Sequence, residues 1–154
     1  MGVVSNEANH DRNVSFTINQ IVIDTLRSRN PNLIAVYIWS DGCAKQFRSK
    51  YVFKSLLLYP TDLTISWDYG EVSHFKGPHD GIGGTIKRSV YQAVQGNKVV
   101  INTAEEFSQA ANRYTQIKVL YLDKKDVQYP QIDDALPIAG TLKIHHMKRE
   151  GTTL

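Results

Sequence analysis

Apolar residues near the start of the chain first recur at helical spacing and then form a continuous run. Between Val14 and Leu26 most of them stand three or four positions apart, and Asn30-Pro31 ends the pattern. This spacing predicts a helix over 14–29. The run Leu33-Ile34-Ala35-Val36-Tyr37-Ile38-Trp39 follows. Its unbroken apolar character predicts a fully buried strand.

The middle of the chain alternates between the helical period and the strand period. Ser49 stands where it could cap a short helix. Residues 63–69 alternate strictly between apolar and polar side chains, which is typical of a strand with one buried face. Helical spacing returns over 80–95, and the Gly96-Asn97 pair that follows is a good helix end.

The last third of the chain completes an alternation of helices and strands. We expect a short extended segment at 98–101, a helix opened by the capping box Thr103–Glu106, a strand at 117–122, a polar loop at 123–137, a last strand at 139–147 and a mobile tail at 148–154. The order predicts an α/β fold with helices on a mixed sheet. We expect it to form one domain over 1–147.

The composition is that of an ordinary soluble domain. Its 154 residues are 42% apolar and 21% charged, and no apolar run approaches a transmembrane length. The N-terminus lacks the layout of a signal peptide, so we expect a nuclear or cytoplasmic protein with no membrane partner. The single cysteine, Cys43, excludes an internal disulfide. The net charge of +3 permits nucleic acid as a partner without demanding it.

Two acids stand at places where a site could form. Asp41 follows the apolar run, at the rim of the predicted sheet, and Asp80 opens the predicted helix over 80–95. Brought together by the fold, two such carboxylates would supply part of a divalent-metal site. The alternative is that each acid has only a local structural role: Asp41 begins a turn, and Asp80 caps a helix.

Basic residues gather near both acids. Lys45, Arg48, Lys50 and Lys54 fall within ten residues with no acid among them, and Lys87-Arg88 lies on the Asp80 helix. They are candidate phosphate contacts, and a solvated helix face is the alternative. Trp39, Trp67 and Tyr69 lie in predicted strands, so we interpret them as core residues rather than base-stacking residues.

The glycines Gly81, Gly83 and Gly84 are unexpected in the first turns of a helix, because each costs about 1 kcal/mol relative to Ala. Two explanations stay open: a phosphate group approaching the backbone N–H groups, or tight packing against the sheet. A nucleotide-phosphate-binding enzyme that uses this turn is a further hypothesis. The spacing matches neither the P-loop nor the Rossmann fingerprint.

Two segments resemble a known family. Ser40-Asp41-Gly42-Cys43-Ala44-Lys45-Gln46-Phe47-Arg48-Ser49 is similar to the segment around the second catalytic acid of retroviral-type integrases and DDE transposases. Gly77-Pro78-His79-Asp80, followed by Lys87-Arg88, stands where that family has a Gly-x-x-Glu at the start of a basic helix. With Ser73-His74 and Lys76 included, the two segments look like transposon-derived proteins of animal genomes. The resemblance covers about residues 14–95.

The resemblance implies an RNase H-like mixed sheet flanked by helices and metal-dependent strand transfer on DNA. Asp41 would be the second catalytic acid and Asp80 the third, and both would bind Mg²⁺ or Mn²⁺. The DNA-binding residues would be Lys45, Arg48, His74, Lys76, Lys87 and Arg88. The chain could also form a homo-oligomer.

The chain departs from the family pattern at two points. Asp80 stands where the family has Glu, which has a longer reach, and there is almost no chain before the helix over 14–29 to carry a first acid. We therefore expect a catalytic-core fragment shortened on its N-terminal side. The alternative is a domesticated, catalytically inactive domain that binds nucleic acid or a partner protein.

Overall fold

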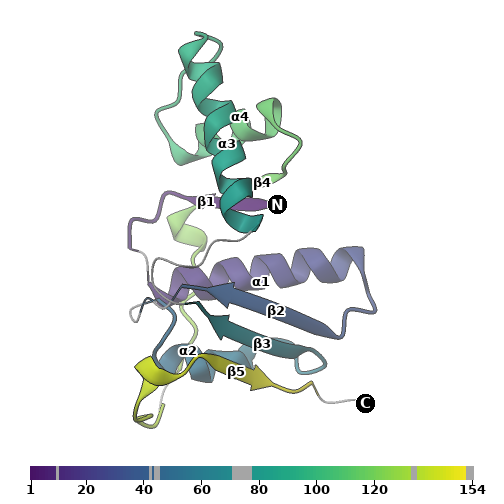
Figure 1. The fold of residues 1–154 in the computed structure, drawn as a ribbon, viewed down its shortest axis with the longest axis vertical. Coiled ribbons are helices and arrows are strands. Elements are labelled where there is room, and N and C mark those ends of the chain that lie inside the picture. Colours follow the sequence, from purple (N-terminus) through teal and green to yellow (C-terminus); the bar gives the residue numbers. More distant parts are fainter. Residues whose placement is uncertain (10, 42, 44–45, 71–77, 133–134, 152–154) are drawn as a thin grey trace. The chain divides into compact units, whose positions relative to one another are not determined.

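The computed structural model describes residues 1–9, 11–41, 43, 46–70, 78–132 and 135–151, and the chain divides into two compact units. Unit 1 comprises Met1–Ala8 and Lys76–Val127, and unit 2 comprises Asn9–Phe75 and Gln128–Leu154. Each unit contains helices and strands, which confirms the predicted α/β class (Figure 1). The residues expected to form one domain are thus shared between two units.

Unit 2 is built on a three-stranded mixed sheet. Its helices are α1 (Arg12–Arg29) and α2 (Lys50–Ser55), and its strands are β2 (Ala35–Ser40), β3 (Thr64–Tyr69) and β5 (His146–Arg149). The strand order is β2-β3-β5, with β2 parallel to β3 and β5 antiparallel to β3. The central strand, β3, contributes Ile65, Trp67 and Tyr69 to the core on one face of the sheet.

Both helices of unit 2 begin where a side chain satisfies their first backbone N–H groups. The carboxylate of Asp11 accepts hydrogen bonds from the N–H groups of Asn13 and Val14 at 2.9 and 3.2 Å. The hydroxyl of Ser49 accepts from the N–H of Val52 at 3.4 Å. The helix over 14–29 and the capping role of Ser49 are therefore confirmed.

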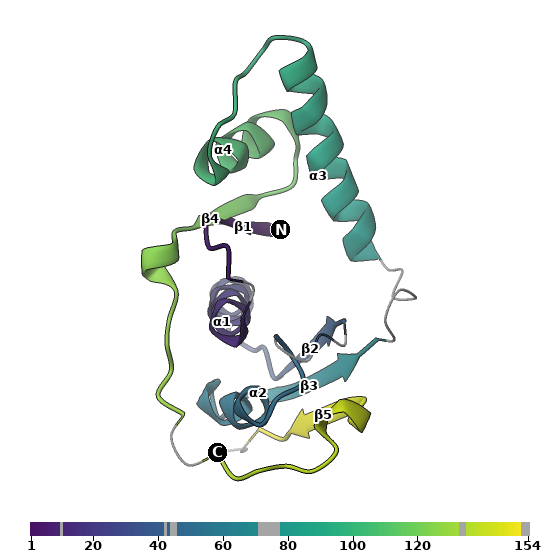
Figure 2. The same ribbon diagram turned by 90° about the vertical axis from the view of Figure 1, so that its left-hand side faces the viewer.

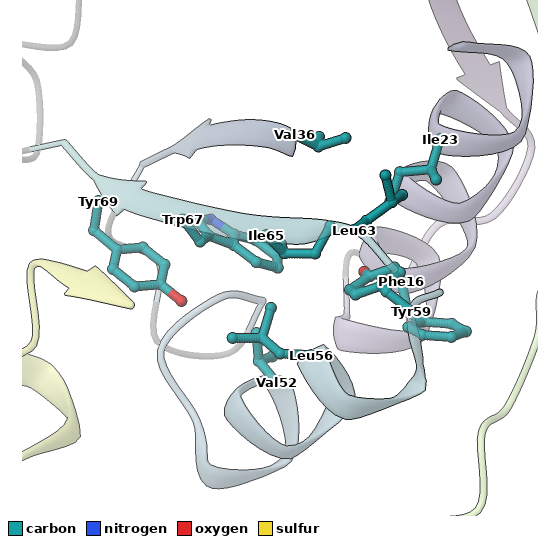
Figure 3. Close-up of a cluster of buried hydrophobic side chains, with 10 residues drawn as sticks. All are labelled: Phe16, Ile23, Val36, Val52, Leu56, Tyr59, Leu63, Ile65, Trp67 and Tyr69. Atoms are coloured by element: carbon teal, nitrogen blue, oxygen red, sulfur yellow. The ribbon is translucent and has the colours of Figure 1, made fainter. Parts of the chain in front are cut away.

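The core of unit 2 collects apolar side chains from both helices and from β2 and β3 (Figure 3). From the middle of β3, Ile65 and Trp67 are 0% and 1% exposed, and Tyr69 packs at its end. The predicted alternation over 63–69 and the core positions of Trp67 and Tyr69 are confirmed. The other core residues are Phe16, Ile23, Val36, Val52, Leu56, Tyr59 and Leu63.

The prediction that the run ending at Trp39 is fully buried is wrong. In β2, Val36 is buried, but Tyr37 and Trp39 are 62% and 59% exposed. The physical reason is that β2 is an edge strand and the core of unit 2 packs on one of its faces. Successive side chains of a strand point to opposite faces, so every second residue is left outside.

The last strand begins seven residues later than the predicted start at 139. A 3₁₀ turn occupies Thr141–Lys143, and β5 runs from His146 to Arg149. Lys148 and Arg149 thus belong to the sheet, although the sequence suggested a mobile tail. The guanidinium of Arg149 fixes them, because it donates hydrogen bonds of 3.2, 2.6 and 2.7 Å to the backbone carbonyls of Tyr59, Pro60 and Leu63.

Unit 1 pairs β1 (Gly2–Ser5) in parallel with β4 (Val119–Leu122). The helices α3 (Pro78–Gln95) and α4 (Ala104–Tyr114) cover this pair (Figure 2). Its buried core consists of Ile86, Val90, Ala110, Ala111 and Val119. At the last registered pair of the two strands, the hydroxyl of Ser5 also donates to the carbonyl of Leu122 at 2.7 Å.

The predicted start of α4 and the predicted end of α3 are both confirmed. Thr103 and Glu106 form a complete capping box at the start of α4. After α3 the backbone turns at Asn97, whose φ of 53° lies in the left-handed region that Asn tolerates. Residues 98–101, expected as a short strand or an extended entry, form no strand in the structure. None of the helices in the described ranges is long and apolar enough to cross a membrane.

Candidate functional site

Asp41 lies directly after Ser40, the last residue of β2, and its side chain is exposed. The strand end is held firmly, because the hydroxyl of Ser40 accepts a hydrogen bond from the indole of Trp67 at 2.9 Å. Asp41 Oδ1 accepts from the N–H of Cys43 at 3.0 Å. The predicted turn at Asp41 therefore exists, and its carboxylate stands at the carboxyl end of a parallel strand pair. In α/β sheets, ligands bind at this end.

Asp80 lies in the first turn of α3, and its side chain is also exposed. The positive end of the helix macrodipole favours a carboxylate at this position. Asp41 belongs to unit 2 and Asp80 to unit 1. Neither unit by itself therefore contains both predicted catalytic acids.

A divalent metal ion in a protein needs several oxygen ligands. Among these residues, no group of three or more His, Cys, Asp or Glu side chains could hold a metal ion. Carboxylates are the right class of ligand, but the described part of each unit does not complete a site around Asp41 or Asp80.

The predicted DNA-binding residues fall into three groups. Lys45, His74 and Lys76 lie outside the described residues. Arg48 supports the fold of unit 2, because its guanidinium donates to the carbonyl of Leu142 at 2.8 Å and lies 5.2 Å from the centre of the Tyr69 ring.

Lys87 and Arg88 form the third group and are exposed on α3. They lie at an apolar hollow of about 500 Å³ in unit 1, which is also lined by Val90, Tyr91, Val94, Ile101 and Phe107. Neither side chain has a hydrogen-bond or ion-pair partner among the described residues. Two such cations on one helix attract anions, phosphate groups among them.

The glycines of α3 are not explained by packing within the described residues. A Cβ atom added to Gly81, Gly83 or Gly84 would meet no atom within 4 Å outside the helix's own backbone. Tight packing therefore gains no support from unit 1. The explanation that a ligand approaches the backbone stays a prediction.

Comparison with known proteins identifies a family. A family described as "Domain of unknown function (DUF8701)" matches residues 1–153. The chain belongs to the DUF8701 family. No curated protein and no solved structure matches the sequence or the fold.

The sequence interpretation missed an exposed aromatic pair in this DUF8701 chain. Tyr37 and Trp39 stack on one another, with ring centroids 6.3 Å apart and an interplanar angle of 20°. They lie on the strand that ends just before Asp41. The signal that could have found them is their i, i+2 spacing, which places them on the same face of any strand.

Proposed function

We propose that this DUF8701 chain acts on DNA as a transposase- or integrase-like catalytic core with an RNase H-like fold. The observation that carries the proposal is the position of Asp41, exposed at the carboxyl end of β2 in a parallel β2–β3 pair. The motif around Asp41, which resembles the second acidic segment of DDE enzymes, supports the same role. A DNA substrate would place the protein in the nucleus.

In this proposal Asp41 and Asp80 contribute carboxylates to Mg²⁺ or Mn²⁺. When bound, such metals activate the attacking oxygen and stabilise the leaving oxygen of a phosphodiester. Lys87 and Arg88 bind the DNA backbone, because they are exposed cations without an acidic partner among the described residues. Lys45, His74 and Lys76 are proposed to contribute further phosphate contacts.

A second candidate function is that of a domesticated, inactive domain that binds nucleic acid. The absence of a three-ligand group among the described side chains favours it. The same basic residues would then bind DNA without a metal. Binding should in that case be salt-sensitive and should survive Asp41→Asn.

Nicking of supercoiled plasmid DNA tests the two candidates. The assay compares the wild type, Asp41→Asn and Asp80→Asn in Mg²⁺ and in Mn²⁺. The matched control is Asp24→Asn, which changes an exposed aspartate in the middle of α1. We expect nicking by the wild type and the control, and background nicking by the other two variants.

Each alternative result has a definite meaning. Nicking that persists in both Asp41→Asn and Asp80→Asn would overturn the catalytic proposal. If none of the four proteins nicks DNA but all of them bind it, the inactive binding domain is correct.

A further inference from the structure

Helix α3 carries apolar side chains that the core of unit 1 does not cover. Ile82, Ile86, Val90 and Val94 stand four positions apart, so they follow one face of the helix. Ile86 and Val90 are buried, but Ile82 and Val94 are each 39% exposed, and the neighbouring Tyr91 is 61% exposed. Contiguous exposed apolar residues mark interaction sites, whereas single scattered ones need no explanation.

These side chains line two neighbouring hollows in unit 1. The first, of about 500 Å³, lies between α3 and Phe107 of α4. The second, of about 310 Å³, lies between the start of α3 and the strands β1 and β4 (Figure 2). Lys87 and Phe107 line both hollows, which therefore adjoin at these two residues. We call the two hollows together, along residues 82–94 of α3, the α3 groove.

The charged side chains that line the α3 groove are positive. Lys87 and Arg88 are exposed there, and neither has a hydrogen-bond or ion-pair partner among the described residues. Within the same described residues, no Asp or Glu side chain lines either hollow. The nearby carboxylate of Glu106 is held by the cap of α4, because it accepts hydrogen bonds from the N–H groups of Asn102 and Thr103 at 2.7 and 3.1 Å. An occupant of the groove therefore meets uncompensated positive charge.

The position of Lys87 between two apolar hollows restricts what can bind. The occupant must present apolar groups on both sides of an anionic group. A fatty acid does not, because its carboxylate ends a single apolar chain, and a nucleic-acid backbone offers charge without apolar side chains. A second copy of the chain that docked through its own α3 would bring like charges together, which is unfavourable.

An amphipathic helix with acidic residues beside its apolar face meets these conditions. Its apolar side chains at positions i, i+4 and i+7 lie on one face and fill grooves of this kind. Residues 82–94 span about 18 Å along α3, at about 1.5 Å per residue, which is long enough for three such anchors.

We propose that the α3 groove binds an acidic amphipathic helix of a partner protein. The apolar hollows receive its apolar side chains, and Lys87 and Arg88 pair with its carboxylates. The inference stands apart from the proposed action on DNA, although both use these two cations. A bound helix would therefore keep DNA phosphates away from Lys87 and Arg88.

Three synthetic helical peptides test the proposal. They share one apolar face of leucines, and the positions beside that face are glutamate in the first, glutamine in the second and lysine in the third. Fluorescence anisotropy of the labelled peptides measures their affinity for the full chain at low salt. We expect the glutamate peptide to bind most tightly and the lysine peptide least. The glutamate peptide should exceed the glutamine peptide roughly 2- to 30-fold, the range expected for two exposed ion pairs.

Charge reversal on α3 should reverse this order. In the double variant Lys87→Glu/Arg88→Glu we expect the lysine peptide to bind most tightly. The matched control is Lys98→Glu/Lys118→Glu, which changes the net charge equally at two exposed lysines of unit 1 outside both hollows. This control should keep the wild-type order.

Loss of an apolar ring should act on all three peptides alike. Tyr91→Ala removes apolar contact from the first hollow without changing charge, so each affinity should fall roughly fivefold or more. Far-UV circular dichroism of every variant confirms that the helices are intact, so a change in affinity can be assigned to the altered side chains.

Several results would overturn the proposal. They are no binding of any of the three peptides, equal affinity of the glutamate and lysine peptides, and an unchanged order in Lys87→Glu/Arg88→Glu. Binding of oleate but of no peptide would assign the groove to a lipid. Dissociation of a wild-type oligomer by Tyr91→Ala, without peptide binding, would assign it to a second copy of the chain. Because the assay contains no DNA, failure of plasmid nicking leaves this result unaffected, and failure of peptide binding leaves the nicking result unaffected.

Discussion

At the scale of single residues, Tyr59 shows how burial changes the chemistry of a side chain. Its ring is 1% exposed and stacks on Phe16 with centroids 5.3 Å apart. Burial raises the pKa of Tyr59 to about 12, and the hydrogen bond from Asn19 partly opposes that rise. Burial also raises the pKa of Tyr69. The folded protein therefore holds both hydroxyl protons more tightly than the unfolded chain does.

The first prediction concerns alkaline pH. Since the folded pKa of Tyr59 lies above its ordinary value of 10.0, its contribution to stability is complete below about pH 10 and is lost as the pH rises toward 12. Tyr59→Phe should reduce this alkaline loss, and Tyr69 should account for what remains. Urea unfolding followed by tryptophan emission between pH 7 and pH 11 measures it. Identical pH dependence in variant and wild type would contradict the assignment.

Arg149 gives a second prediction at this scale. Lysine cannot reproduce the fork of donors that reaches the carbonyls of Tyr59, Pro60 and Leu63, so Arg149→Lys takes hydrogen bonds away from partly buried acceptors. The carbonyl of Pro60 keeps a second donor, the N–H of Leu63 at 3.1 Å. We expect the free energy of unfolding to fall by about 1–3 kcal/mol per acceptor left unpaired, measured by urea titration. Lys143→Ala, an exposed change outside the sheet, is the control and should be nearly neutral. An equally small effect for Arg149→Lys would mean that β5 is held mainly by its strand pairing.

At the scale of elements, helix α3 is followed by a left-handed turn at Asn97 but carries three glycines that weaken it. A Cβ atom at Gly83 or Gly84 would meet no described atom, so alanine fits at both positions. At Gly96 the added Cβ would lie 3.3 Å from the carbonyl oxygen of Gln92, which is a tight contact. The helix would thus be more stable without the glycines of its first turns.

The third prediction follows from this comparison. Gly83→Ala and Gly84→Ala should each raise the free energy of unfolding of unit 1 by about 1 kcal/mol, as measured by thermal circular dichroism. Gly96→Ala is the control and should give no gain. If a phosphate approaches the backbone here, the two stabilised variants should also bind DNA more weakly. Unchanged DNA affinity would remove the phosphate explanation.

Sequence signals between neighbouring residues predicted several helix starts and one strand correctly. Whether a strand is buried on both faces depends on its tertiary neighbours, which these signals do not contain. The N-cap at Ser49, the capping box at Thr103 and the alternation over 63–69 depend on neighbours within a few residues, and all three are confirmed. An apolar run such as 33–39 is compatible with a central strand or with an edge strand. For the same reason the position of Asp41 after a strand was predictable, whereas the exposure of Tyr37 and Trp39 was not.

At the scale of the whole molecule, the chain forms two units with separate apolar cores. Both tryptophans, Trp39 and Trp67, belong to unit 2, and Trp67 is part of its core. Tryptophan emission therefore reports on unit 2, whereas circular dichroism reports on the helices of both units. The two signals together can show whether the units unfold independently.

The fourth prediction uses the difference between tryptophan emission, which reports on unit 2, and circular dichroism, which reports on both units. Ile86→Ala should destabilise unit 1 by about 2–5 kcal/mol, because it empties part of a buried core, and Ile86→Val should cost about 0.5–1.5 kcal/mol. We expect the unfolding transition followed by circular dichroism to split or to begin under milder conditions, and this change should be larger for Ile86→Ala than for Ile86→Val. The transition followed by tryptophan emission should keep its wild-type midpoint. An equal shift in both signals would show that the two units unfold as one cooperative system.

The parallel pairing of β1 with β4 has a consequence for synthesis on the ribosome. Ser5 and Leu122, joined by a hydrogen bond, are 117 positions apart in the chain. At about 5–20 residues per second, β4 emerges on the order of ten seconds after β1. During that interval β1 is an unpaired strand with free backbone groups, while most of unit 2 is already being made. The two-stranded sheet of unit 1 therefore cannot form until the segment that contains β4 has been synthesised, so unit 1 completes its fold late although its first strand is made first.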